Sequence, residues 1–265
     1  MIKLISLDLD GTLLDSRGQV TEASKAAIIK ARAAGVRVVI NTGRDCREAA
    51  WFAREAGCDT LASSTGGALV WDSAADRALR RWDVPEPSGR RAVELCVGWG
   101  FDLMVFAGEE TLVNSSCKKY LERYYPFACF HEHAVVTNDP LGYMEEHGLP
   151  LTKLHGELDP SQYPLEQLAA LPGVTLTSSS SHDVELVAAG VDKGRALALI
   201  AGRYGVPLED CAAVGDSEND LEAFRAVGTP IVMGNAPEHV KAAAVRIAPS
   251  NAEEGAAWAV LSCLE

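Results

Sequence analysis

The sequence predicts an α/β fold in which a Rossmann-like parallel sheet forms the core and an α+β domain is inserted into it. In the first and last thirds of the 265 residues, apolar strand patterns alternate with helical patterns, as in a parallel sheet flanked by helices. The middle of the chain instead combines short strand-like runs with helices and Pro/Gly breaks, which is typical of a separate small domain.

The composition is that of a folded globular protein with an acidic surface. Hydrophobic residues make up 48% of the chain and charged residues 23%. The 24 basic and 37 acidic residues give a formal net charge of −13, so the molecular field repels nucleic acids and anionic lipids. No apolar run reaches the roughly 18 to 20 residues that cross a bilayer, and the apolar start meets Asp8 too early for a signal peptide. We therefore expect a cytoplasmic protein that binds neither nucleic acid nor membrane.

The first third of the chain predicts a βαβ unit. Residues 3–7 form a short apolar run that ends in Asp-x-Asp-Gly, which indicates a strand followed by a turn. Residues 21–34 carry alanine and isoleucine at helical spacing and end at Gly35, and residues 36–40 are again rich in β-branched side chains. The two strands therefore lie parallel, with the helix as their connection.

The last third repeats this alternation. Its expected elements are a helix at 195–204, a strand at 211–214, a helix at 221–226 and a strand at 231–233. The middle segment carries strand-like runs at 101–106, 111–114, 151–155 and 174–178. We therefore divide the chain into a core of residues 1–82 and 182–265 and an inserted α+β domain of residues 83–181.

Three strands of the core run directly into polar clusters. The clusters are Asp8-Leu9-Asp10-Gly11-Thr12, Asn41-Thr42-Gly43-Arg44 and Gly215-Asp216-Ser217-Glu218-Asn219-Asp220. Because the carboxyl ends of parallel strands share one edge of a sheet, we expect these clusters to converge. Asp8, Asp10 and Asp216 would then repel one another, and a hard divalent cation with oxygen ligands relieves that repulsion. The sequence therefore predicts a metal, with Mg²⁺ as the usual ion where phosphate also binds.

Each cluster also has a structural explanation. Asp216 and Asp220 can act as helix caps, and Thr42 can belong to an ordinary turn. Asp8 and Asp10 are harder to explain structurally, because two carboxylates directly after a buried strand leave charge at an interior edge without a packing benefit.

Lys193 is an independent hint of function. Asp192 is an expected N-cap, which places Lys193 in the first turn of a helix, where the helix dipole disfavours a cation. The alternative is a surface lysine, which would cost only a few tenths of a kcal/mol there.

In this order the motifs resemble the haloacid dehalogenase (HAD) superfamily of phosphotransferases, and specifically its Cof-like phosphatases with a class II (subtype B) cap domain. The matching segments are Asp8-Leu9-Asp10-Gly11-Thr12-Leu13-Leu14, Thr42-Gly43-Arg44, Gly190-Val191-Asp192-Lys193-Gly194, Gly215-Asp216-Ser217-Glu218-Asn219-Asp220 and Met233-Gly234-Asn235-Ala236. Lys193 follows Thr42 by 151 positions, which leaves room for such a cap. The resemblance implies that residues 83–181 are this cap domain and that it sets substrate specificity.

The resemblance also implies a Mg²⁺-dependent phosphatase that hydrolyses small phosphorylated metabolites, sugar or cofactor phosphates, through an aspartyl phosphate. Asp8 is the implied nucleophile and Asp10 the implied general acid and base. The implied metal ligands are Asp8, the main-chain carbonyl of Asp10, and Asp216. The implied phosphate- and substrate-binding residues are Thr42, Gly43, Arg44, Lys193 and Asn219. Asp220 and Asn235 are expected behind these groups, where they orient Lys193 or the metal ligands.

Two positions depart from the family pattern. The expected flap carries Thr65-Gly66-Gly67-Ala68 where relatives often have Asn-Gly-Ala, and Asn41 stands where a small apolar residue is usual. Neither departure removes a catalytic group, and both positions are expected at the mouth of the site.

Several alternatives stay open at this point. A phosphomutase on the same fold would keep all the motifs but return the phosphoryl group to its substrate. A phospho-accepting signalling or binding module would also need an acidic pocket, a hydroxyl residue and a lysine. We expect a monomer or a homodimer. From Asp83 to His182, five histidines could contact a phosphate ester or a second metal, or be solvated or capping residues: His131, His133, His147, His155 and His182. A small basic group on an expected helix could be a sugar-phosphate clamp or a solvated face: Lys118, Lys119 and Arg123.

Overall fold

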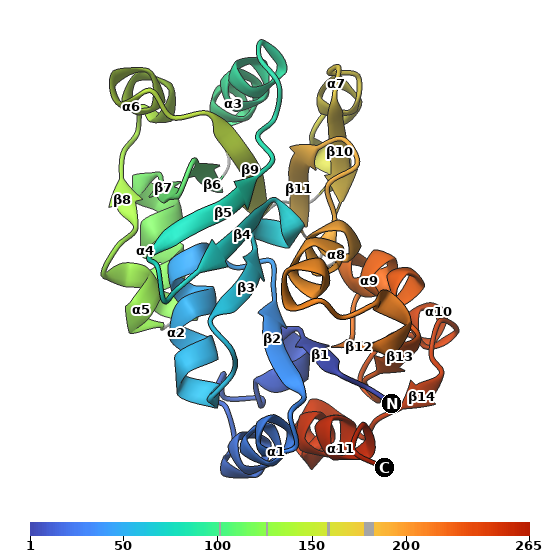
Figure 1. The fold of residues 1–265 in the computed structure, drawn as a ribbon. Helices are drawn as coiled ribbons and strands as arrows, with labels where there is room; N and C mark the ends of the chain where they lie inside the picture. The colour runs from blue at the N-terminus through green and yellow to red at the C-terminus, as the bar shows by residue number, and fades with distance from the viewer. Residues whose placement is uncertain (101, 126, 158–159, 178–182) are drawn as a thin grey trace. The chain divides into compact units, whose positions relative to one another are not determined.

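A computed structural model of the chain describes residues 1–100, 102–125, 127–157, 160–177 and 183–265 (Figure 1). The chain divides into two compact units. The first unit consists of Met1–Arg80 and Asp192–Glu265, and the second of Arg81–Val191. The second unit is therefore an insertion in the first.

The first unit is built on a mainly parallel sheet. Among the described residues it has eight strands, in the order β14-β13-β12-β1-β2-β3-β4-β5. Their bounds are β1 (Leu4–Leu7), β2 (Arg37–Asn41), β3 (Leu61–Ser64), β4 (Leu69–Asp72), β5 (Arg77–Arg81), β12 (Cys211–Gly215), β13 (Thr229–Val232) and β14 (Arg246–Ile247). β1, β2, β3, β12, β13 and β14 pair in parallel, whereas β4 runs antiparallel to β3. The predicted α/β class with a parallel core sheet is confirmed.

Helices cover both faces of this sheet. They are α1 (Glu22–Ala33), α2 (Cys46–Ala56), α8 (Lys193–Tyr204), α9 (Leu221–Ala226), α10 (Glu238–Lys241) and α11 (Gly255–Ser262). Shorter helical turns are η1 (Leu9–Leu13), η2 (Thr65–Gly67), η4 (Leu208–Asp210), η5 (Glu218–Asp220) and η6 (Asn251–Glu253). α2 and α8 both pack on β2 and β3, which lie between them in Figure 1. β2 and β3 are therefore covered by helices on both sides.

The register of the sheet brings three strand ends to one level. Leu7 of β1 lies beside Val214 of β12 on one side and beside Ile40 of β2 on the other. The strand order also reverses between β1 and β12, which is the point where open α/β sheets bind their ligands. The residues that follow these strands, beginning with Asp8, therefore leave the sheet at a common edge.

The second unit is an α+β domain. Among the described residues its sheet has six strands in the order β10-β11-β9-β6-β7-β8. The strands are β6 (Asp102–Ala107), β7 (Glu110–Val113), β8 (Val135–Val136), β9 (Leu151–Glu157), β10 (Val174–Thr177) and β11 (Asp183–Ala188). The helices are α3 (Ser88–Trp99), α4 (Ser115–Tyr124), α5 (Ala128–His131), α6 (Pro140–His147) and α7 (Glu166–Ala169), and η3 (Pro160–Gln162) is a helical turn. An apolar core that includes Val93 of α3, Val105 of β6 and Leu154 of β9 joins the helix to the sheet.

The opposite face of this sheet is partly polar. Alternation along the strands places Lys153 and His155 of β9, and Asp183 and Glu185 of β11, on the face opposite the apolar core. His155 and Glu185 are register partners, and all four residues are buried. Non-local strand pairing thus gathers ionisable groups that lie far apart in the sequence.

The exit from the inserted segment differs from the sequence-based division. The expected boundary, the serine run at 178–181 and His182, lies outside the described residues. β11, which the sequence analysis assigned to the core, pairs with β9 and β10 and belongs to the second unit. A short buried strand carries no local signal that says which sheet it joins. The assignment of the units as catalytic core and cap domain stays a prediction.

Candidate active site

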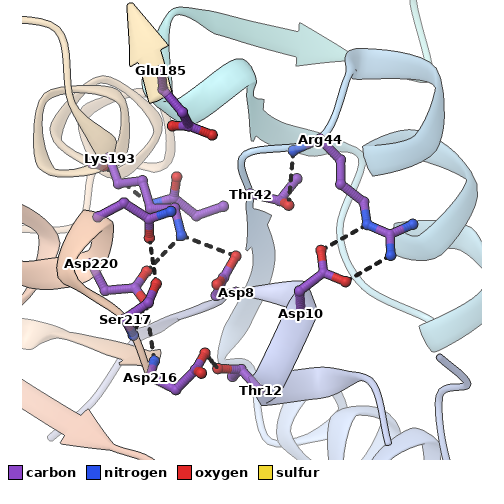
Figure 2. A network of polar contacts seen from close by, with 12 residues as sticks. Asp8, Asp10, Thr12, Thr42, Arg44, Glu185, Lys193, Asp216, Ser217 and Asp220 are labelled. Atoms are coloured by element: carbon purple, nitrogen blue, oxygen red, sulfur yellow. Dashed lines mark hydrogen bonds and ion pairs between the residues drawn. The ribbon is translucent and has the colours of Figure 1, made fainter. Parts of the chain in front are cut away.

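Lys193 lies at the centre of a buried polar network in the first unit (Figure 2). Its Nζ lies 3.0 Å from Oδ1 of Asp8 and 2.7 Å from Oδ1 of Asp220. The lysine side chain is 1% exposed. The structure therefore brings together residues from three of the sequence motifs, which are far apart along the chain.

The position of Lys193 follows from how α8 begins. The side chain of Asp192 accepts a hydrogen bond from the Arg195 amide at 2.8 Å and so caps the helix. Lys193 is the first residue of α8 and so lies in the first turn, where the sequence analysis placed it, although the helix begins two residues before the expected 195–204. The helix dipole disfavours the ammonium group there, and the carboxylates of Asp8 and Asp220 compensate for it.

Asp220 connects this lysine to the loop after β12. Its Oδ2 accepts hydrogen bonds from the amides of Asp216 and Ser217, at 3.0 and 3.1 Å. Its Oδ1 is thereby directed toward Lys193. Asp220 therefore fixes both the loop and the lysine through the two oxygens of one carboxylate.

Asp216 faces the loop that follows β1. Its Oδ1 accepts a hydrogen bond from Thr12 Oγ1 at 2.9 Å, and its Oδ2 accepts one from Asn235 Nδ2 at 3.3 Å. The same Asn235 nitrogen donates to the Gly11 carbonyl at 2.8 Å. Gly11 has φ of +70°, and a Cβ there would lie 2.2 Å from Asp216 Oδ2. Glycine is therefore required in Asp-x-Asp-Gly both for its conformation and for the approach of Asp216.

The electrostatics of the network show an excess of negative charge. Burial, together with Asp220, Asp216 and Asp10, raises the pKa of Asp8 well above its usual value, and Lys193 only partly offsets this. Burial and the charge of Asp220 raise the pKa of Asp216 to about 6. Burial alone would lower the pKa of Lys193, but Asp220 and Asp8 raise it above its ordinary value. One ammonium group thus faces three carboxylates.

This donor set fits a divalent metal. Asp8, Asp216 and Asp220 each offer a carboxylate oxygen, and these oxygens lie within 4.8 Å of one another. Oxygen-only ligands suit a hard cation, and a cation would favour the ionised forms that burial and mutual repulsion disfavour. Asp220 accepts hydrogen bonds from Lys193 and two amides. Asp216 accepts one hydrogen bond on each oxygen and Asp8 contacts Lys193 through one oxygen, so these two carboxylates are less occupied than Asp220.

Comparison with known proteins decides the family. The profile of the haloacid dehalogenase-like hydrolases matches residues 5–260. This chain belongs to that family. The predicted family, and the prediction of an enzyme of the phosphatase class, are confirmed. HAD phosphatases generally use a divalent metal, in agreement with the donor set of Asp8 and Asp216.

Individual relatives match over nearly the whole chain. Phosphatase YwpJ of Bacillus subtilis is 27% identical, over 97% of this chain and 98% of that protein. Pyridoxal phosphate phosphatase YbhA of Escherichia coli is 26% identical, over 99% of this chain and 98% of that protein. The solved structure of a haloacid dehalogenase-like hydrolase from B. subtilis has a TM-score of 0.84 at 26% identity, and the match covers 98% of this chain and 99% of that one.

In this HAD hydrolase, Asp10 and Arg44 form a separate pair (Figure 2). Arg44 Nε and Nη2 donate to the two carboxylate oxygens of Asp10 at 2.8 and 2.7 Å, and Nη1 donates to Glu48 at 3.0 Å. The Arg44 side chain is 5% exposed, whereas that of Asp10 is 61% exposed. Arg44, which we expected at the phosphate, is therefore held by two carboxylates in this structure.

The remaining predicted phosphate ligands make local hydrogen bonds. Thr42 is buried, and its Oγ1 accepts a hydrogen bond from the Arg44 amide at 3.2 Å. Gly43 is half-buried between them. Asn219 Oδ1 accepts a hydrogen bond from Ser217 Oγ at 2.9 Å. Thr42 and Gly43 thus lie at the end of β2 and Asn219 in the loop after β12.

The candidate residues of the second unit contact groups within that unit. Lys118 Nζ lies 2.8 Å from His131 Nδ1, and the other ring nitrogen of His131 lies 2.8 Å from the Tyr125 carbonyl oxygen. Further placements are His133 beside the Phe130 ring, His147 stacked on Tyr143, Arg123 over the Tyr124 ring, and Lys119 exposed on α4. Of the five histidines named in the sequence analysis, His155 is the one that the described residues place in a cluster of metal-ligating groups.

The sequence analysis missed several residues of these networks. Thr12 has no assigned role in the first motif, and Glu48, four residues after Arg44, is not considered. Arg44 precedes α2, so no helical spacing points to their contact. The pair of Lys153 and Glu185, 2.6 Å apart, was also missed. No local pattern reveals that pair, because it depends on the pairing of β9 with β11.

Proposed function

We propose that this protein is a Mg²⁺-dependent phosphatase that hydrolyses phosphate monoesters of small metabolites through a phosphoaspartate on Asp8. The observation that carries the proposal is the buried contact between Lys193 and Asp8 at the shared edge of β1, β2 and β12. A carboxylate held beside a fixed ammonium group suits phosphoryl transfer, because the ammonium orients the nucleophile and stabilises charge on the transferring group.

In the first step Asp8 attacks. One of its oxygens forms a bond to phosphorus in line with the ester oxygen, and the bond between phosphorus and that oxygen breaks. Asp10 gives its proton to the departing oxygen, which leaves as an alcohol. In the second step Asp10 takes a proton from water, the water oxygen bonds to phosphorus, and the bond from phosphorus to Asp8 breaks. Phosphate and the original Asp8 result.

The two proposed steps need Asp10 in two arrangements, and the structure shows it paired with Arg44. A carboxylate that accepts two hydrogen bonds from a guanidinium group is in the form that can accept a proton, as the second step requires. The first step needs a protonated Asp10 at the leaving oxygen. Asp10 therefore has to leave Arg44 when substrate binds, and its exposed side chain leaves it free to turn.

Phosphoryl binding falls to residues on three strand ends. We assign the Thr42 hydroxyl, the Gly43 amide and the Lys193 ammonium to the phosphoryl oxygens. Arg44, which now pairs with Asp10 and Glu48, and Asn219 are assigned to the substrate as well.

Asp8, Asp216 and the main-chain carbonyl of Asp10 would hold the Mg²⁺. When bound, the ion would neutralise charge between the nucleophile and the phosphoryl oxygens. Asp220 would keep Lys193 in place, and Asn235 would keep Asp216 directed at the loop after β1. The choice of Mg²⁺ rests on the all-oxygen donors and on the phosphate substrate.

The relatives support a small phosphorylated substrate. The names of two of them give pyridoxal phosphate and 5-amino-6-(5-phospho-D-ribitylamino)uracil as what they act on. The net charge of −13 opposes binding to nucleic acid, and every described helix is too short or too polar to span a bilayer. We accordingly assign sugar or cofactor phosphates as substrates, the second unit as the cap domain that selects them, a cytoplasmic location, and a monomer or homodimer.

Phosphate release tests this proposal. The protein is incubated with phosphorylated sugars, nucleotides and cofactors, with and without Mg²⁺, and Asp8→Asn serves as the blank. We expect metal-dependent release that is lost in Asp8→Asn while the fold is retained. Isomerisation of a phosphorylated substrate that needs a bisphosphate activator and releases no phosphate would indicate a phosphomutase. Wild-type release from Asp8→Asn would exclude Asp8 as the nucleophile.

A further inference from the structure

Asn41 makes a side-chain contact that links β2 to the start of α8. It is the last residue of β2, directly before Thr42, and it is 3% exposed. Its Nδ2 donates a hydrogen bond to the main-chain carbonyl oxygen of Lys193 at 3.1 Å. Because a carbonyl oxygen only accepts, the nitrogen of the amide has to face it, and the orientation of the Asn41 amide is thereby fixed.

The first turn of α8 is tightly enclosed. A Cβ on Gly67 would lie 2.1 Å from the Asp192 carbonyl oxygen and 2.8 Å from the Lys193 nitrogen. A Cβ on Gly194 would lie 2.4 Å from the Glu222 carbonyl oxygen. Two glycines thus let the flap turn and α9 approach the backbone around Lys193, and Asn41 adds a directed polar attachment to it.

Packing does not explain an amide at position 41. Its Oδ1 has no hydrogen-bond partner among the described residues, as is also true of Ser63 Oγ and Thr65 Oγ1. Ser63 is the register neighbour of Asn41 on β3. A buried amide that makes only some of its possible hydrogen bonds stabilises the fold less than an apolar side chain of similar size. The contribution of Asn41 therefore lies in the bond to Lys193.

We propose that Asn41 is a positioning residue for Lys193: it holds the main-chain carbonyl of the lysine and so fixes the point from which Nζ reaches Asp8. The inference rests on the proposed function, in which Lys193 binds the phosphoryl group. A lysine has a long flexible side chain, so a fixed backbone is needed to keep Nζ near 3.0 Å from Asp8. Displacement of a catalytic group by about 1 Å can cost on the order of 100-fold in rate.

A double-mutant cycle tests whether Asn41 acts through Lys193. The four proteins are wild type, Asn41→Leu, Lys193→Gln, and the double variant; the affinity for inorganic phosphate is measured by calorimetry with Mg²⁺ present. We expect Asn41→Leu to weaken phosphate binding by about tenfold and to lower kcat/KM by about 10- to 100-fold. In the Lys193→Gln background the same change is expected to weaken phosphate binding by less than about twofold, because the residue it positions is gone.

Ser63→Ala is the matched control. It removes a buried polar atom at the neighbouring strand position, one without a hydrogen-bond partner in the described part of the chain, and we expect it to leave phosphate affinity and kcat/KM unchanged. Thermal unfolding checks that each variant is folded. If Asn41→Leu does not fold, Asn41→Ala, which adds no bulk, replaces it in the cycle with the same expected result.

The outcomes separate this inference from the proposed function. Equal losses from Asn41→Leu in the wild-type and Lys193→Gln backgrounds, or no loss in either, would overturn the positioning role. Wild-type phosphate affinity and turnover in Lys193→Gln would instead overturn the assignment of Lys193 in the proposed function.

Discussion

Each unit of the protein contains a buried lysine, and the two lysines have similar contacts. Lys193 in the first unit lies 2.7 Å from the nearest carboxylate oxygen, of Asp220, and Lys153 in the second lies 2.6 Å from Glu185. Both side chains are at most 2% exposed. Each lysine also lies in a cluster with three metal-ligating side chains, whose ligand atoms come within 4.8 Å of one another. Geometry alone does not distinguish the two clusters.

The charge around each lysine distinguishes the two clusters. In the first unit burial and neighbouring carboxylates raise the pKa of Asp8 and of Asp216, because one lysine cannot balance three acidic groups. In the second unit burial alone would raise the pKa of Glu185, but Lys153 and His155 lower it well below its usual range. Ionisation is therefore disfavoured at Asp8 and Asp216 in the first cluster and favoured at Glu185 in the second.

The difference assigns a role to each cluster. The first cluster has more negative than positive charge, so a divalent cation would relieve the repulsion among its carboxylates, as expected of a site for a metal and a phosphoryl group. In the second cluster Lys153 already occupies Glu185, so a metal would have to displace an ion pair. We interpret the second cluster as a balanced buried ion pair that stabilises the second sheet.

The largest expected effect is on activity, which should depend on Lys193 and not on Lys153. Lys193→Met should lower kcat/KM by about 100- to 1000-fold, because it removes the ammonium group that stabilises the transferring phosphoryl group. Lys153→Met should change kcat per folded molecule by less than about tenfold. The measurement is steady-state kinetics at saturating Mg²⁺, with the folded fraction determined by circular dichroism. Equal losses in the two variants would contradict the comparison.

Loss of a carboxylate should lower the stability of the protein more in the second cluster than in the first. Glu185→Gln leaves the buried ammonium of Lys153 without a carboxylate, which we expect to lower the free energy of unfolding by about 3–5 kcal/mol. Asp220→Asn should cost less, because Lys193 keeps its contact with Asp8 and the local excess of negative charge decreases. Urea unfolding measures both.

The control for this stability prediction is the double variant Lys153→Met/Glu185→Gln. Because it removes both charges, it should be more stable than Glu185→Gln alone. A double variant that is less stable than the single one would show that the ion pair is not what Glu185 contributes.

Mg²⁺ should stabilise the protein through the first cluster. At a concentration about 100 times the dissociation constant, a ligand bound only by the folded state adds about 2.7 kcal/mol to the free energy of unfolding. We expect Mg²⁺ to raise the unfolding midpoint of wild type and EDTA to reverse the increase. Asp216→Ala should abolish this response, whereas Asp183→Asn in the second cluster should keep it. A response to Mg²⁺ that depends on Asp183 would place the metal in the second unit and contradict our assignment of the metal to the first cluster.

The first cluster is the part of the molecule that the sequence predicts best. Its residues follow directly from apolar strands or from a helix cap, as with Asp8, Asp216 and Lys193, and such signals are local. The parallel topology then brings them together without further information. The convergence of the motifs and the α/β class could therefore be predicted from the sequence.

The second cluster could not be predicted, for physical reasons. Lys153 and Glu185 are brought together by the register of β9 with β11, which local patterns do not encode. The pairing of Arg44 with Asp10 was missed for a related reason: motif spacing shows that both residues lie near the site, but not which side chains pair. The same holds for Asn41, which the sequence analysis expected at the mouth of the site and which is buried against Lys193.

The smallest expected effect is a difference in pH dependence in the metal-free protein. The folded-state pKa of Asp216, about 6, lies above the ordinary value of 3.8, so the folded protein keeps this proton at a pH where the unfolded chain has lost it. Between these values the contribution of Asp216 to stability falls as the pH rises, by at most about 1.4 kcal/mol per pH unit. Glu185 has a lowered pKa, so its contribution is present above the ordinary value of 4.5 and is lost as the pH falls toward its folded-state pKa.

Urea unfolding in EDTA at pH 5 and pH 6 tests this sign for Asp216. The free energy of unfolding of Asp216→Asn relative to wild type should increase between pH 5 and pH 6, because the variant does not lose the neutral form that burial and Asp220 favour. Saturating Mg²⁺ in place of EDTA should remove this change in the difference between the two proteins, since the ion favours the ionised carboxylate of wild type. If the difference in free energy of unfolding between Asp216→Asn and wild type is the same at both pH values, Asp216 does not lie in an excess of negative charge. The proposed contrast between the two clusters would then be wrong for the first cluster.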